Sequence, residues 1–164
     1  MRLLLILTAF VFLSCSRQTE TNNISATNSD KVDNSPDFNV ALTFINGYAT
    51  FCTPTSPPTN DTNWIRNNSL LTDSFKMTYY NLINSARKED PELGLDFDPI
   101  FDAQDFPDKG FVLLNSDVKS GLVTVKGKDW PEFVLVLKVV QQDGKSLVDG
   151  SGVINIPVDK RAKR

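Results

Sequence analysis

The stretch at residues 90–110, DPELGLDFDPIFDAQDFPDKG, most constrains how this chain can fold. Its prolines, Pro91, Pro99 and Pro107, exclude a regular helix or a central strand. Leucine, isoleucine and phenylalanine nevertheless recur between the carboxylates, which is too apolar for a free linker. An apolar segment without a period must be held by contacts with the structure around it. We therefore expect an ordered crossover that fastens a helical half of the chain to a sheet.

The residues before this crossover carry helical periods. Ser35-Pro36-Asp37 is typical of a helix start, and apolar residues then recur on two helical faces over 38–52. Prolines interrupt the chain at 53–61, and a short helical piece is expected at Trp64-Ile65. A second helix is predicted from about Thr72 to Arg87, where apolar residues share one face.

After the crossover the apolar period changes to two, which is typical of strands. Strands are predicted at 111–115, 122–126, 133–141 and 146–156. The third is partly apolar on both faces, so it should be central. Helices followed by an antiparallel meander predict an α+β fold, with the helices on one face of a curved sheet of about four strands.

The N-terminus has the pattern of a secretory signal. A basic start and an apolar run at 3–13, too short to span a bilayer, lead to Ser14. Phe12-Leu13-Ser14-Cys15 resembles a bacterial lipobox, in which the cysteine is acylated and becomes the first residue. The alternative is an ordinary signal peptide with a chance cysteine. Because Ser16 rather than aspartate follows, the resemblance implies an outer-membrane protein facing the periplasm.

Four regions are expected along the 164 residues. They are a signal peptide at 1–14, the acylated cysteine with a flexible tether at 15–35, a single domain at 36–158 and a basic tail at 159–164. The tether is predicted because its polar composition cannot bury enough apolar area to offset the entropy of ordering. The tail is expected to be solvated, with contact to anionic lipid or cell-wall polymer as the alternative.

Composition excludes several kinds of chemistry. The chain has no histidine, which removes serine–histidine and cysteine–histidine catalysis and most zinc sites. With Cys15 acylated, Cys52 cannot form an intramolecular disulfide, and we expect it to be a small buried apolar side chain. A formal net charge of -3 gives no reason to expect a nucleic-acid partner.

The crossover is rich in carboxylates, which are the ligands that calcium prefers, so a calcium site is the first functional hypothesis. The spacing fails the EF-hand template, because Pro99 and Ile100 stand where ligands and glycine belong. Aspartates that bond the backbone of their own turns explain the pattern better. No metal and no cofactor is therefore predicted for this set: Glu89, Asp90, Glu92, Asp96, Asp98, Asp102, Asp105 and Asp108.

Three segments together resemble the DUF3828 family of bacterial lipoproteins, which includes YbjP-type proteins. They are LGLDFDPIFDAQDFPD in the crossover, the first helix with Phe44 and Tyr48, and the closing VDGSGVINIP. The resemblance covers about 38–157, and DFDP followed by AQD is its most specific part. It implies a nuclear-transport-factor-two-like, cystatin-like fold, in which long helices lie in a bent sheet and form a cone. The family is largely uncharacterised, so the resemblance supplies no catalytic residue.

Four residues are candidates for ligand contact or structural anchoring: Gln104, Asp105, Asp98 and Tyr79. We expect the Gln104 amide to be buried and tied to the backbone. Folds of this kind host isomerases and dehydratases that use an aspartate with a tyrosine, here Asp98 or Asp105 with Tyr79 or Tyr80. No spacing selects such a pair, so no catalytic residue is assigned.

The sequence thus predicts an envelope lipoprotein, held on the membrane through the lipid on Cys15. Its expected role is non-catalytic binding of a small apolar ligand or of a periplasmic protein. The alternative is an immunity-type inhibitor of a toxin delivered to the periplasm, since an acidic surface suits a basic toxin. A small isomerase-like or dehydratase-like enzyme is the third reading.

Overall fold

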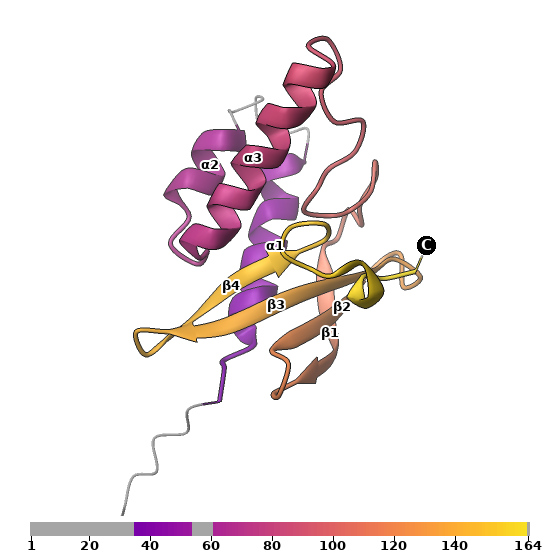
Figure 1. Cartoon of the computed structure of the whole chain (residues 1–164). Coiled ribbons are helices and arrows are strands. Elements are labelled where there is room, and N and C mark those ends of the chain that lie inside the picture. The colour runs from indigo at the N-terminus through magenta and orange to yellow at the C-terminus, as the bar shows by residue number, and fades with distance from the viewer. Residues whose placement is uncertain (1–34, 54–60, 164) are drawn as a thin grey trace, which may run out of the picture. The chain divides into compact units, whose positions relative to one another are not determined.

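The computed structural model of this chain describes residues 35–53 and 61–163 (Figure 1). The predicted signal peptide, the predicted lipidation site at Cys15 and nearly all of the predicted tether lie outside the described residues. The described part has helices first and an antiparallel sheet after them, so the predicted α+β class is confirmed. Its elements are α1 (Asn39–Cys52), α2 (Asp61–Asn67), α3 (Asp73–Glu89), β1 (Phe111–Asp117), β2 (Leu122–Gly127), β3 (Val134–Gln142), β4 (Lys145–Ser151) and the 3-10 turn η1 (Val158–Lys160).

The sheet is a meander in the order β1-β2-β3-β4, and each strand pairs antiparallel with the next. The central place predicted for the third strand is confirmed. Both edges are partly covered by the helical half. Beside β4, the Val148 N–H donates to the Leu70 carbonyl at 2.8 Å and the Thr72 N–H donates to the Val148 carbonyl at 3.0 Å. Beside β1, the Asn46 side chain accepts from the Phe111 N–H at 2.7 Å and donates to the Phe111 carbonyl at 3.2 Å.

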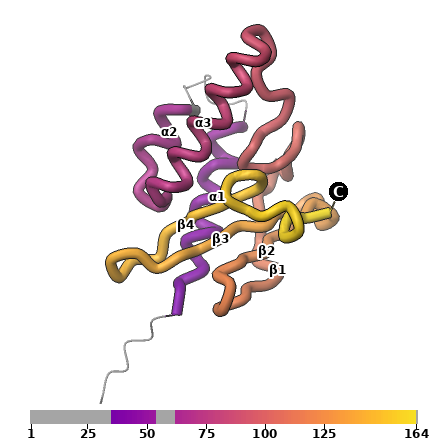
Figure 2. The backbone as a smooth tube through the Cα atoms, in the orientation of Figure 1, coloured from indigo at the N-terminus to yellow at the C-terminus, as the bar shows by residue number. Residues whose placement is uncertain are grey.

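Helix α1 lies against one face of the sheet, and from Phe44 onward it also meets α2 and α3 (Figure 2). Phe44 is buried and meets Phe75 of α3 edge to face, with ring centroids 5.5 Å apart. The two apolar faces predicted for this helix are explained by that double contact. Burying such aromatic side chains contributes much of the stability of a small domain. The sheet supplies the other side of the core with Val123, Val125, Leu135, Leu137 and Val139.

The crossover at 90–110 is ordered without regular helix or strand, as the sequence predicts. Ile100 and Phe101 are fully buried. The Phe101 ring stacks on Phe106 with centroids 4.4 Å apart and on Phe111 of β1 at 5.9 Å. Leu93, by contrast, is 76% exposed, so the buried contacts of the crossover begin after its first residues.

The start of the first helix and the end of the last strand both differ from the prediction. The first helix begins at Asn39, and the Asp37 carboxylate accepts the Asn39 N–H at 3.0 Å instead of standing in the first turn. The last strand ends at Ser151 rather than at residue 156, because the chain turns at Gly152 with a φ of +58°. Only glycine adopts that conformation at little cost.

The chain after β4 folds back onto the crossover. The Ser151 hydroxyl donates to the Ile100 carbonyl at 2.9 Å, and the Val153 N–H donates to the Pro99 carbonyl at 3.0 Å. Further on, the Arg161 Nε donates to the Ile156 carbonyl at 3.0 Å. This part of the predicted basic tail is therefore packed on the domain.

Candidate functional site

The Asp98 carboxylate holds the crossover in place through hydrogen bonds to its own turn and to α1. Its Oδ1 accepts the backbone N–H groups of Ile100 at 2.8 Å and Phe101 at 3.0 Å, and its Oδ2 accepts the Tyr48 hydroxyl at 2.7 Å. The turn-bonding expected of the crossover aspartates is confirmed at this position. With both oxygens engaged by the fold, Asp98 serves as a structural anchor.

Tyr48 is the residue that the sequence analysis missed. Tyr79 and Tyr80 were considered as partners of the aspartate, yet the hydroxyl that reaches Asp98 belongs to Tyr48 on α1. Tyr79 is buried in the core, and the Tyr80 hydroxyl donates to the Thr62 carbonyl at 2.6 Å. Burial raises the pKa of Tyr48 well above its ordinary value, and the charge of Asp98 raises it further. Tyr48 is therefore a neutral hydrogen-bond donor at physiological pH.

Gln104 and Asp105 lie on the surface, so the burial predicted for Gln104 is wrong. The turn at 98–103 places Ile100 and Phe101 inside and leaves Gln104 and Asp105 outside. The Gln104 amide still ties backbone together, since its Nε2 donates to the Asp96 carbonyl at 3.1 Å. Because that bond is exposed to water, its loss should cost less than the loss of a buried one.

Both residues line a groove of about 380 Å³ that also contains Trp130, which we call the Trp130 groove. Two of the four predicted candidates, Gln104 and Asp105, are thus brought together at one surface site. Asp98 and Tyr79 are not among its lining residues. Trp130 lies in the connection between β2 and β3, and no local sequence pattern links that connection to the crossover.

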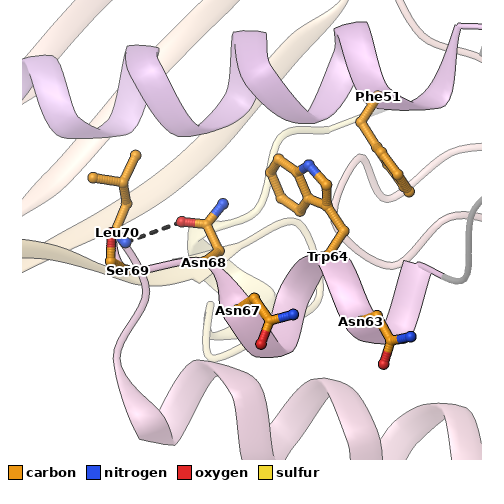
Figure 3. Close-up of a pocket in the computed structure, with 7 residues that line it drawn as sticks. All are labelled: Phe51, Asn63, Trp64, Asn67, Asn68, Ser69 and Leu70. Atoms are coloured by element: carbon orange, nitrogen blue, oxygen red, sulfur yellow. Dashed lines mark hydrogen bonds between the residues drawn. The ribbon is translucent and has the colours of Figure 1, made fainter.

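A larger groove of about 950 Å³ lies between the end of α1, helix α2 and the segment that follows it; we call it the α1–α2 groove (Figure 3). Phe51 of α1 and Trp64 of α2 form its aromatic wall, with ring centroids 5.3 Å apart. Trp64 also meets Tyr48 at 5.4 Å, so this wall is continuous with the core. Leu70 adds apolar surface at the other end.

The rim of the α1–α2 groove is polar, and none of the described residues that line it is charged. Asn63 and Asn67 are exposed and stand one turn apart on α2. Asn68 accepts the Leu70 N–H at 2.9 Å, which fixes the segment after the helix (Figure 3). The groove therefore offers amide donors and acceptors beside aromatic rings.

Neither groove resembles a metal centre. Within residues 35–53 and 61–163, no three side chains of the histidine, cysteine, aspartate and glutamate types are grouped so that they could hold a metal ion. Across the same residues, no helix has the length and apolar character needed to cross a membrane. Cys52 is half-buried and packs against the core.

Comparisons with known proteins identify no relative, since no protein-family model, curated protein or solved structure matches the chain. The resemblance to the DUF3828 family stays a prediction from the sequence. Function must therefore be argued from the two grooves.

Proposed function

We propose that the protein is a lipid-anchored protein of the bacterial envelope, facing the periplasm from the outer membrane, and that its domain is a non-catalytic binding module. The α1–α2 groove is its ligand site, and the ligand is a small uncharged molecule with an apolar face. The observation that carries this proposal is the lining that the described residues give the groove: two aromatic rings, a rim of amides and no charged side chain.

The lining selects the ligand class by desolvation. A charged ligand would lose hydration in the groove and find no counter-charge there. An apolar face packs on Phe51 and Trp64, while Asn63 and Asn67 supply donors and acceptors that orient the polar edge. Because the Trp64 ring already packs on Tyr48 and Phe51, little ordering is needed on binding.

The envelope part of the proposal depends on the N-terminal sequence. The apolar run at 3–13 and the cysteine at position 15 support export and acylation. The polar stretch that follows supports a tether between the lipid and the domain.

A second candidate is recognition of a protein, including the immunity-type role. It is favoured by four exposed apolar residues on β1 and the turn after it: Val112, Leu113, Leu114 and Val118. Apolar side chains exposed along a sheet edge are typical of a surface that another chain covers.

Native mass spectrometry tests the ligand proposal. The full chain is extracted from membranes in mild detergent as wild type, as Asn67→Glu and as Met77→Glu. Asn67→Glu places a charge on the groove rim, whereas Met77 is exposed on α3 and does not line the groove. We expect a retained small molecule in wild type and in Met77→Glu and its loss in Asn67→Glu. Equal retention by all three proteins contradicts the assignment of the groove.

A further inference from the structure

Trp130 is an aromatic surface that the fold holds open to solvent. Its side chain is 44% exposed in the turn between β2 and β3. The ring meets Phe133 edge to face with centroids 5.1 Å apart, and Phe133 in turn meets Phe111 in the core at 5.9 Å. The Phe133 N–H also donates to the Trp130 carbonyl at 3.0 Å, which fixes the turn. A tryptophan fixed and exposed in this way is typical of a binding surface.

The crossover forms the facing wall of the Trp130 groove and is equally fixed. Asp98 and Ala103 exchange backbone hydrogen bonds of 2.8 and 3.3 Å immediately before the wall. The crossover and the turn also approach closely at Gly127, where a Cβ would collide with the Trp130 carbonyl and the Pro107 ring. The groove of about 380 Å³ is therefore formed before any ligand arrives.

The charges around this ring are mainly negative. Asp105 and Glu132 line the groove, and both are exposed. The salt bridges between described side chains join Lys138 to Asp149 and Lys160 to Asp159, so neither groove carboxylate takes part in one. The cation that does line the groove is Lys163, from the C-terminal end of the chain. The molecule itself thus places an alkylammonium side chain at this site.

We propose that the Trp130 groove binds an organic ammonium group, the chemistry that a lysine side chain of another protein shares with a free alkylamine. The ammonium is attracted both to the face of an aromatic ring and to carboxylates. The alkyl chain packs on the apolar surface of Trp130 and Phe133. Lys163 has the same chemistry and competes from within the chain. This site is independent of the α1–α2 groove, whose described lining residues are all uncharged.

Two-dimensional NMR of the full chain in detergent tests the proposal, because the chain has two tryptophans and hence two indole N–H signals. The probes are N-acetyl-lysine methylamide, its norleucine analogue, which keeps the alkyl chain without the charge, and pentylamine. We expect the lysine probe to shift the Trp130 signal and leave Trp64 in place. A shift by the lysine probe alone assigns the source to a protein side chain, and an equal shift by pentylamine assigns it to a free amine. The proposal is overturned if norleucine binds as well as lysine, or if neither cation moves Trp130.

In a second experiment, the Kd for the lysine probe is measured for variants that remove single charges. Glu132→Gln and Asp105→Asn keep side-chain shape at exposed positions, so both should fold, and each should raise Kd about two- to fivefold. Asp143→Asn makes the same change of charge in the β3–β4 turn, outside the groove, and should leave Kd unchanged. Lys163→Gln should lower Kd by removing the internal competitor. Equal effects of Glu132→Gln and Asp143→Asn, or weaker binding in Lys163→Gln, would refute the ammonium site.

Discussion

Replacing Tyr48 by phenylalanine removes one hydroxyl from the centre of the domain and leaves the ring. The hydroxyl donates to the Asp98 carboxylate at 2.7 Å, and Tyr48 is 1% exposed. The aromatic contacts with Phe44, Trp64 and Phe101 do not need the oxygen, so they should persist. Asp98 keeps its two backbone N–H partners but loses the donor to Oδ2. The substitution therefore isolates one charge-assisted hydrogen bond.

The expected loss of unfolding free energy is about 1.5–3 kcal/mol, the range for a hydrogen bond to a charged group. For a domain of this size each kcal/mol lowers Tm by about 4 °C, so the variant should melt about 6–12 °C lower. Urea unfolding followed by tryptophan fluorescence measures the free energy, and circular dichroism measures Tm.

The matched control is Tyr80→Phe, which removes a hydroxyl that donates to a neutral carbonyl at 2.6 Å. Its cost should be about 0.5–1.5 kcal/mol. If Tyr48→Phe costs no more than Tyr80→Phe, the Asp98 carboxylate adds nothing and the anchoring role fails.

Three further predictions address pH, backbone geometry and the membrane anchor. Burial raises the pKa of Tyr48 above its ordinary value of 10.0, so on raising the pH the unfolded state loses the Tyr48 proton before the folded state does; the free energy of unfolding is unaffected below pH 10.0 and falls as the pH rises toward the folded pKa. Urea titrations at several alkaline pH values should show a smaller fall in Tyr48→Phe than in wild type. Gly152→Ala should lower the free energy of unfolding by at least about 2 kcal/mol, because the residue has a positive φ and an added Cβ would collide with two crossover carbonyls. Gly144→Ala is the control: it also has a positive φ but open space around it, and it should cost about 1 kcal/mol in the same urea titrations. Cys15→Ala should move the protein from the membrane fraction to the soluble fraction on cell fractionation, and continued membrane association would refute the lipobox interpretation.

Local rules predicted the elements well, because each depends on neighbours in the chain. The second long helix was expected from Thr72, and Thr72 is its N-cap, with its hydroxyl accepting the Phe75 N–H at 3.0 Å. The change of apolar period from helical to alternating located all four strands of the sheet. The meander followed from their short connections.

The pairings that build the candidate sites could not be predicted in this way. Tyr48 and Asp98 are 50 residues apart, and Asn46 and Phe111 are 65 apart. Periodicity states which face of α1 is buried, yet it does not state which crossover oxygen meets a given hydroxyl. The exposure of Gln104 has the same origin, since it depends on how the turn at 98–103 sits against α1.

The crossover couples the core to the surface. On one side Tyr48 holds the Asp98 turn, and on the other the Ser151 hydroxyl and the Val153 N–H hold the carbonyls of the same turn. Gln104 follows that turn directly, so the wall of the Trp130 groove is placed by contacts made entirely inside the domain. The α1–α2 groove is instead placed by helix packing around Trp64. In a domain built in this way, surface substitutions can change the lining of one groove while the core that positions both stays the same.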